Sequence, residues 1–232
     1  MEKLIRGFAF DLEGTIIDIE RLHHLSHIRA ARALGIDIDI RKAKRNLFHF
    51  IGGPDEAVAE EMAALSTKKV SVEDLLMLKN KFLLKSLGKE NTLFCRKGFG
   101  KFIEWAKGKK VPLAIGTVTS HLLAIILLEK VGILIRPEDF ALVTKEDVKK
   151  PKPFPDVYQE TARRMKILAQ NQLVFEDSIV GLQAALRAGS QVITIPTMKT
   201  EDFICKLKAS GARAVFQTWD DPGLYELIDQ LI

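Results

Sequence analysis

The sequence predicts an α/β protein in which a doubly wound, Rossmann-like parallel sheet carries an inserted all-helical domain. From about residue 92 onward, short apolar runs alternate with helical patterns, which is typical of parallel strands covered by helices on both faces. Between residues 18 and 91, consecutive helical patterns replace this alternation. The chain has 232 residues, enough for a core domain with a substantial insertion. We therefore expect a core domain built from residues 1–17 and 92–232, and a helical domain at 18–91.

The strands of the expected sheet are short apolar runs. The sequence predicts them at residues 4–10, 111–116, 140–143, 172–176, 191–195 and 214–217. Helical patterns separate most of them and lie at 98–107, 120–131, 155–168, 179–188 and 222–231. Gly132 and Gly189 follow two of these helices as stop signals. Because the strands read as continuous apolar runs, we expect helices on both faces of the sheet.

The inserted segment contains helical patterns at 18–35, 40–53, 54–65 and 71–88. Pro54 stands at a first helical turn, where proline is well tolerated. Ser71 and Asp74 form an acidic variant of the capping box. Because the insertion begins directly after an acidic turn that ends the first strand, we expect it to act as a lid over that turn.

No feature of the sequence points to a membrane or to an oxidising compartment. Residues 111–128 have about the length of a membrane span. Pro112, Gly116 and a polar run interrupt that segment, which favours a strand, a turn and a helix. The first residues lack the apolar core of a signal peptide. Cys95 and Cys205 fit neither a disulfide framework nor a metal-ligand spacing, so we expect reduced thiols in a cytoplasmic protein.

The charge pattern favours a small anionic ligand over a nucleic acid. The formal net charge is +5, which suggests anionic partners only in a general way. Basic clusters at 41–45 and 107–110 are scattered and lack interleaved aromatic residues, so we interpret them as solvated surface. We expect neither a nucleic-acid nor a membrane partner, and nothing in the sequence requires more than a monomer.

Polar residues gather just after four of the predicted strands. Three carboxylates surround a Gly-Thr turn after the first strand, a threonine follows the second, a lysine lies beyond the third and an acidic pair ends the fourth. In chain order these residues are Asp11, Glu13, Asp18, Thr117, Lys152, Glu176 and Asp177. Each cluster alone is typical of a turn or a helix cap. Ligands of open parallel sheets bind at the carboxyl ends of the strands, so four such clusters together predict a functional site.

The order of these clusters resembles that of the haloacid dehalogenase superfamily of phosphotransferases. The superfamily's Asp-x-Asp-Gly-Thr motif matches DLEGT at 11–15 except at the third position. Its threonine or serine after an apolar strand matches Thr117, and its Lys-Pro-x-Pro-Asp motif matches KPFPD at 152–156. The fourth motif matches VFEDSIVGLQAALRAG at 174–189. The resemblance covers almost the whole chain, looks most like the β-phosphoglucomutase and phosphoglycolate phosphatase branch, and implies that the inserted helices form that branch's cap domain.

This resemblance implies a Mg²⁺-dependent phosphatase acting on a small phosphorylated metabolite. Asp11 would be the nucleophile that forms an aspartyl-phosphate, and also a metal ligand. The Glu13 backbone carbonyl and Asp177 would be further ligands, with Glu176 binding directly or through water. A divalent cation would offset the repulsion among these carboxylates. An oxygen-only ligand set with open positions for water suits Mg²⁺.

The remaining roles follow from the same resemblance. Lys152 and the Thr117 hydroxyl would offset charge on the phosphoryl oxygens. Glu13 would be the general acid/base, although this branch normally has aspartate there, so the side chain is one methylene longer. The other expected phosphate- or substrate-binding residues are Gly14, Thr15, Val118, Thr119, His23, Gly52 and Gly53.

Several alternatives stay open. A β-phosphoglucomutase-like mutase is disfavoured by Ile51 and Asp55, which stand where that enzyme carries basic residues. A weakly active or non-catalytic phosphate-binding homologue is the other rival. Lys149 and Lys150 compete with Lys152 for the lysine motif, although the full Lys-Pro-x-Pro-Asp spacing favours Lys152.

Two polar features near the first inserted helix also have structural interpretations. Asp18 either joins the site or caps that helix. His23 and His27 have the i, i+4 spacing of a helical metal pair. No Glu or Cys set completes a zinc site with them in the sequence, so we expect no zinc there. His23 either takes part in binding, as the resemblance implies, or is a polar residue of the helix.

Overall fold

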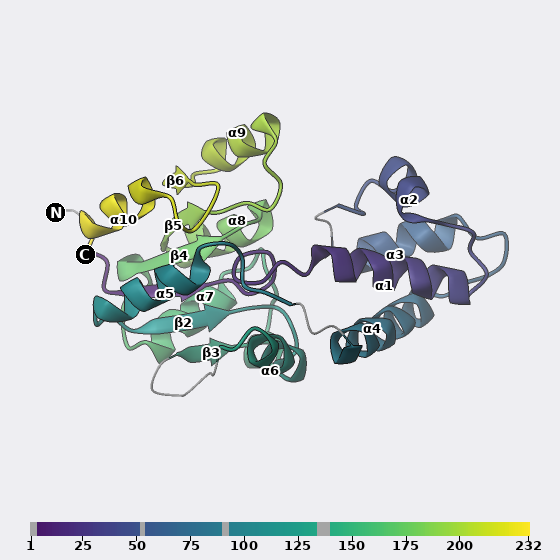
Figure 1. Ribbon diagram of the computed structural model, residues 1–232, viewed down its shortest axis with the longest axis horizontal. Helices are drawn as coiled ribbons and strands as arrows, with labels where there is room; N and C mark the ends of the chain where they lie inside the picture. Colours follow the sequence, from purple (N-terminus) through teal and green to yellow (C-terminus); the bar gives the residue numbers. More distant parts are fainter. Residues whose placement is uncertain (1–3, 52–53, 90–92, 134–139) are drawn as a thin grey trace. The chain divides into compact units, whose positions relative to one another are not determined.

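The computed structural model describes residues 4–51, 54–89, 93–133 and 140–232. The chain divides into two compact units (Figure 1), one made of Met1–Asp18 with Leu93–Ile232 and the other of Ile19–Thr92. The first unit is α/β, and the described part of the second is helical. The expected fold class, a doubly wound parallel sheet with an inserted helical domain, is confirmed.

Six parallel strands, counted over the described residues, form the sheet in the order β3-β2-β1-β4-β5-β6. They are β1 (Gly7–Phe10), β2 (Leu113–Gly116), β3 (Ala141–Val143), β4 (Gln172–Glu176), β5 (Gln191–Thr194) and β6 (Ala214–Val215). Every residue of β1, β2 and β4 is buried, as the continuous apolar runs predict. The strand order reverses between β1 and β4, and a sheet of this kind binds its ligands at that switch point.

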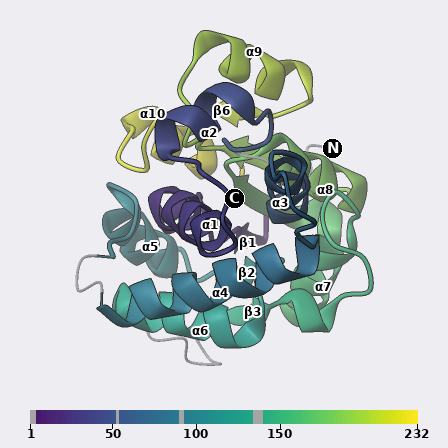
Figure 2. The same ribbon diagram turned by 90° about the vertical axis from the view of Figure 1, so that its right-hand side faces the viewer.

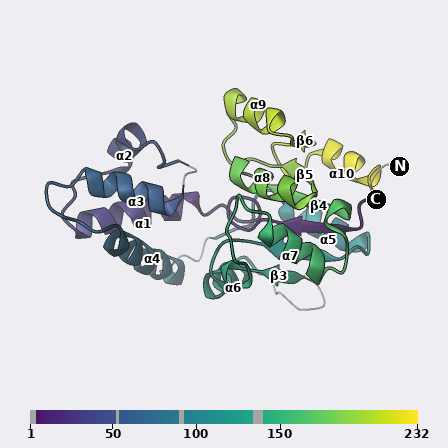
Figure 3. The same ribbon diagram turned by 180° about the vertical axis from the view of Figure 1, so that it is seen from behind.

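Helices cover both faces of this sheet (Figures 1 and 3). On one face lie α7 (Asp156–Arg164), α8 (Ile179–Ala188) and α9 (Glu201–Ala209), which pack on small and branched side chains of the strands. The other face carries an aromatic cluster in which Phe10 and Phe175 stack with ring centroids 5.0 Å apart. Phe102 from α5 (Phe99–Gly108) and Trp219, which precedes α10 (Pro222–Asp229), belong to the same cluster. Burial of these rings contributes much of the stability of the core.

The segment that imitates a membrane span forms a strand, a polar turn and a helix. It contains β2 and the start of α6 (His121–Lys130), which confirms the prediction for residues 111–128. Within the described part of the chain, no helix combines the length and the apolar character needed to cross a bilayer.

Two helices of the α/β unit differ from the predicted pattern. The helix expected at 155–168 ends at Arg164, because Lys166 adopts a left-handed backbone conformation with φ 58°. Helix α9 was not predicted at all. Of its apolar residues Leu207 is fully buried, and Phe203 is partly buried against the same core. Its start is marked by Thr200, whose hydroxyl accepts a hydrogen bond from the Phe203 N–H.

The helical unit contains α1 (Glu20–Ala33), α2 (Ile40–Asn46), α3 (Asp55–Ala64) and α4 (Val72–Lys89). Helix α1 packs along α4 (Figures 1 and 2), around a core that includes Ala31, Met62 and Leu75. The Ser71 hydroxyl accepts a hydrogen bond from the Asp74 N–H, in line with the predicted cap.

Asp18 does not cap α1, so that alternative was wrong. The N-cap residue of α1 is Ile19, and no side chain makes a capping hydrogen bond there. Asp18 lies one residue too early to reach the orphan N–H groups of the first turn and is exposed.

The chain leaves and re-enters the α/β unit through two segments that pair with each other. Ile17 forms an antiparallel bridge with Cys95. The Arg96 N–H donates to the Ile16 carbonyl over 2.7 Å. Both segments belong to the α/β unit, so the acidic turn after β1 is tied to the residues that follow the helical insertion.

Candidate active site

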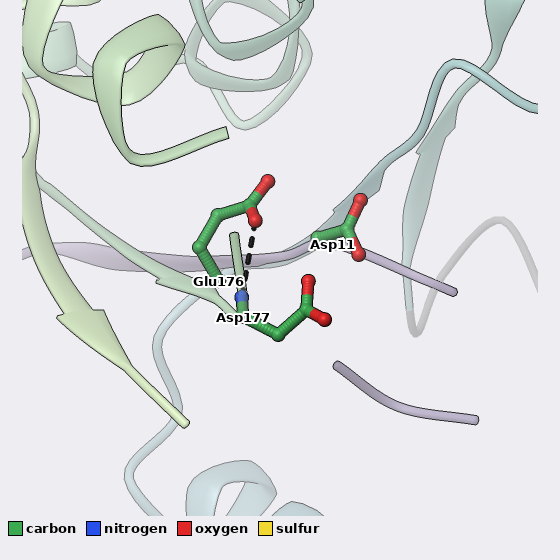
Figure 4. A group of neighbouring side chains, drawn as sticks. All are labelled: Asp11, Glu176 and Asp177. Atoms are coloured by element: carbon green, nitrogen blue, oxygen red, sulfur yellow. Dashed lines mark hydrogen bonds between the residues drawn. The ribbon is translucent and has the colours of Figure 1, made fainter. Parts of the chain in front are cut away.

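The acidic residues of two motifs meet because β1 and β4 are neighbours in the sheet. Phe10 pairs with Phe175, and the Asp11 N–H donates to the Phe175 carbonyl over 3.0 Å. Asp11 therefore stands beside Glu176 and Asp177 at the carboxyl edge of the sheet (Figure 4). One carboxylate oxygen from each of the three lies within 4.8 Å of the other two. The structure thus brings together the three side chains that the sequence analysis assigns to a metal.

Lys152 adds a positive charge to this acidic group. Its Nζ donates to Asp11 Oδ1 over 2.5 Å and to Glu176 Oε1 over 2.7 Å, and its side chain is only 6% exposed. The rival Lys150 lies elsewhere, with its Nζ 4.8 Å from the centre of the Phe154 ring. The structure therefore brings Lys152, and not Lys150, to the carboxylates.

Glu176 has protein donors on both carboxylate oxygens. Besides Lys152, Oε1 accepts a hydrogen bond from the Tyr158 hydroxyl over 2.6 Å. Oε2 accepts from the Asp177 N–H (the dashed line in Figure 4) and from the Ser178 hydroxyl, each over 3.1 Å. Burial on its own would raise the pKa of Glu176, but Lys152 and these hydrogen bonds hold that pKa below its usual value. Glu176 is therefore a buried anion that fixes the position of Lys152.

The other two carboxyl groups are less well compensated. Burial raises the pKa of Asp11 to about 7, against the opposing effect of Lys152 and with a further contribution from the charge of Glu176. Burial, followed by the charges of Glu176 and Asp11, also raises the pKa of Asp177. Crowded carboxylates with too little positive charge, offering only oxygen donors, fit a hard divalent cation.

Metal-free protein should therefore lose stability as the pH rises from about 4 to about 7. The folded-state pKa of Asp11, about 7, lies above the ordinary value of 3.8 that it has when unfolded. The folded state then binds more protons across this window, so the Asp11 contribution is complete below its unfolded pKa and is lost as the pH rises through 7. The Asp11 contribution is measured by urea unfolding in EDTA at several pH values, as the difference in free energy of unfolding between wild type and Asp11→Asn. A difference that stays flat across the window would contradict the expectation.

The loop after β2 holds the predicted phosphate-binding residues in different environments. Thr117 is buried, and its hydroxyl accepts a hydrogen bond from the Thr119 N–H over 3.1 Å, which leaves its own proton to donate to a ligand. Val118 is exposed, whereas Thr15, in the turn after β1, is fully buried. The Thr119 hydroxyl donates to Glu13 Oε1 over 2.7 Å. Thr119 therefore contacts the expected acid/base.

Arg96 is a second cation at this edge of the sheet. Its guanidinium donates to the carbonyls of Gly14 over 2.6 Å and Pro196 over 2.9 Å, and also to that of Ile195. These bonds join the acidic turn to the loop after β5. Gly14 has a φ of 88°, and a side chain there would overlap the Asp177 carboxylate, so glycine is needed at this position.

His23, the predicted binding residue of the helical unit that the structure describes, has a partner inside that unit. His23 Nδ1 lies 3.7 Å from Asp55 Oδ1, and His27 Nε2 lies 2.8 Å from the same oxygen. The Lys79 ammonium pairs with the other Asp55 oxygen. The carboxylate that meets the histidine pair is thus already in contact with a lysine, which argues against a cation there. The expected residues Gly52 and Gly53 lie outside the described residues.

Three residues that support the site were not predicted to do so. Ser178 carried a signal, because it follows the acidic pair and accepts a hydrogen bond from the Gly181 N–H as the N-cap of α8. No sequence pattern indicated Tyr158 or Arg96, since each reaches the site from an element whose position depends on the assembled sheet.

The fold and the site together define a Rossmann-like α/β protein with an acidic centre at the carboxyl edge of its parallel sheet. The chain belongs to the haloacid dehalogenase-like hydrolases, because the model of that family matches residues 8–195. The superfamily and the enzyme class expected from the sequence are thereby confirmed.

Similar proteins include enzymes named as phosphatases. The chain is 28% identical to the fructose-1-phosphate phosphatase YqaB of Escherichia coli, over 82% of this chain and 95% of that protein. It is 29% identical to a phosphorylated carbohydrates phosphatase of Thermotoga maritima, over 82% of this chain and 84% of that protein. CbbY from Rhodobacter sphaeroides, solved in complex with phosphate, shares the fold with a TM-score of 0.75 at 23% identity, over 95% of this chain and 97% of that one. β-Phosphoglucomutase from Clostridium difficile does so with a TM-score of 0.73 at 20% identity, over 98% of both chains.

Proposed function

We propose that the protein is a Mg²⁺-dependent phosphatase that hydrolyses a small phosphorylated metabolite through an aspartyl-phosphate. The observation that carries this proposal is the group formed by Asp11, Asp177 and Lys152, in which a buried nucleophilic carboxylate, a second carboxylate for a cation and a buried ammonium lie together. The names of the relatives favour a sugar phosphate as the substrate. The inserted helical unit would serve as the cap domain.

In the proposed reaction, each site residue of the α/β unit has its own role. Asp11 attacks phosphorus, and the bond from phosphorus to the leaving oxygen breaks. Glu13 protonates the leaving oxygen, then takes a proton from the water that releases inorganic phosphate from Asp11. Lys152 and the Thr117 hydroxyl offset charge on the phosphoryl oxygens. A bound Mg²⁺ would be held by Asp11, Asp177 and the Glu13 carbonyl, and would supply further stabilisation of negative charge.

Glu176 takes a supporting role in this scheme. Both of its carboxylate oxygens already accept hydrogen bonds from the protein. A direct bond to a metal would displace one of these donors, so contact through water is favoured for Glu176. Asp177 lacks such saturation and is the better direct ligand.

A phosphatase is favoured over a mutase by the residues of the helical unit. Where the mutase carries a basic residue, this chain has Asp55, whose side chain is 37% exposed and is held in place by Lys79 and His27. A fixed carboxylate repels a second phosphate instead of binding it. We therefore expect monophosphates to be better substrates than bisphosphates.

The proposal is tested by assaying p-nitrophenyl phosphate and a panel of sugar monophosphates with Mg²⁺ and with EDTA. We expect release of inorganic phosphate that EDTA abolishes and added Mg²⁺ restores. Glucose 1-phosphate with a bisphosphate activator serves as the mutase assay, in which glucose 6-phosphate would appear in place of inorganic phosphate. Folded protein that binds Mg²⁺ yet turns over no ester would refute the phosphatase.

A further inference from the structure

The Glu13 side chain, one methylene longer than aspartate, brings its carboxylate within hydrogen-bond distance of Thr119. Glu13 Oε1 accepts a hydrogen bond from Thr119 Oγ1 over 2.7 Å, across 106 positions of sequence. The two residues follow β1 and β2, which are neighbours in the sheet. The turn that carries Glu13 is closed by a hydrogen bond from the Gly14 N–H to the Ile17 carbonyl over 2.8 Å. The Glu13 backbone thus belongs to a hydrogen-bonded turn, and its carboxylate is bound by Thr119 of the adjacent loop.

Thr119 is a rigid partner because its backbone is fixed on both sides. Its N–H donates to the Thr117 hydroxyl over 3.1 Å. Its carbonyl accepts from the Lys145 N–H over 3.1 Å. With the peptide groups on both sides held, the Thr119 hydroxyl has little freedom of position and can hold the Glu13 side chain in one rotamer.

We propose that Thr119 is a positioning residue that fixes the Glu13 carboxylate for acid/base catalysis, an inference that rests on the proposed phosphatase function. The contact depends on glutamate. An aspartate would be shorter by one carbon–carbon bond, about 1.5 Å, and a gap of that size breaks a hydrogen bond of normal length. Thr119 thereby compensates for the longer and more flexible side chain, and its hydroxyl is directed at Glu13 and not at the phosphate.

The first test replaces Thr119 by valine, which keeps the shape and removes the hydroxyl. We expect kcat to fall by about tenfold to a hundredfold. KM and the inhibition constant of inorganic phosphate should change by less than about twofold. Aspartyl-phosphate should accumulate in acid-quenched samples, because activation of water by Glu13 is slowed. Glu13→Gln, which removes the carboxylate itself, sets the upper limit of the loss.

Two further variants serve as controls for this exchange. Thr119→Ser keeps the hydroxyl and should restore most of the wild-type kcat. Ser120→Ala is the matched control in the next position, since the Ser120 side chain makes no capping hydrogen bond to α6. An inhibition constant of phosphate that rises as much as kcat falls would assign the Thr119 hydroxyl to phosphate binding and overturn the proposal.

The second test repeats Thr119→Val in a Glu13→Asp background, where the contact cannot form. The exchange should then lose most of its effect on kcat, and an equal loss in both backgrounds would overturn the proposal. Urea unfolding of the same four proteins measures the coupling between positions 13 and 119 without any turnover. Coupling in unfolding with no turnover of any ester would refute the phosphatase but leave the contact standing. Strictly additive effects would refute the contact whatever the activity.

Discussion

Replacing Asp11 by asparagine should lower kcat by at least about a thousandfold, because an amide oxygen cannot act as the nucleophile in place of a carboxylate. The same exchange should leave the metal-free protein folded and more stable at neutral pH. One of three crowded carboxyl groups loses its charge, and the burial that raises the pKa of Asp11 to about 7 no longer opposes folding there.

The measurement combines turnover of p-nitrophenyl phosphate with urea unfolding of the same samples. Asp18→Asn is the matched control, since Asp18 lies in the same acidic turn but is exposed. We expect that variant to keep wild-type turnover to within about twofold. Residual activity of more than a few per cent in Asp11→Asn, together with an inactive Asp18→Asn, would show that Asp11 is not the nucleophile.

Replacing Lys152 by alanine should lower kcat by about a hundredfold to a thousandfold. It should also destabilise the fold by about 3–5 kcal/mol, because the buried Asp11 and Glu176 would lose the cation that both contact. Since two effects are combined, kcat has to be measured under conditions in which circular dichroism shows the variant to be folded.

Lys150→Ala is the control for this exchange, because Lys150 belongs to the same basic run but is exposed and contacts the Phe154 ring. It should change turnover by less than about twofold. An active Lys152→Ala beside an inactive Lys150→Ala would transfer the role to Lys150 and show that the spacing of the motif had been misinterpreted.

The sequence predicts the architecture well because the sheet is encoded by local patterns. Continuous apolar runs give the strands β1, β2 and β4, and each is followed at once by a polar cluster that the parallel sheet carries to the same edge. The meeting of Asp11 with Asp177 follows from the pairing of β1 with β4. The sequence predicts that both residues follow strands, but not that these strands are neighbours. Helix α9 was missed although Leu207 and Phe203, four positions apart on one helical face, pack on the core.

The environment of each side chain could not be predicted in the same way. Glu176 and Asp177 are adjacent carboxylates with similar chemistry, yet the pKa of one is lowered and that of the other is raised. The difference arises from Tyr158 and Lys152, which reach Glu176 from other elements. Likewise, no local pattern indicates that Thr119 contacts Glu13 or that Arg96 contacts the Gly14 carbonyl. Such long-range polar contacts depend on tertiary packing.

The pairing of the segments that flank the helical insertion has a consequence for evolution. Ile17 bridges to Cys95, the Arg96 N–H bonds to Ile16, and the Arg96 guanidinium bonds to the Gly14 carbonyl, all within the α/β unit. The two ends of the insertion are therefore held together at the acidic turn after β1. Residues 19–92 can diverge, lengthen or be exchanged for another sequence while the geometry of that turn is inherited unchanged. Under the proposed function, substitutions in the helical unit would change substrate preference without altering the residues that carry out the chemistry.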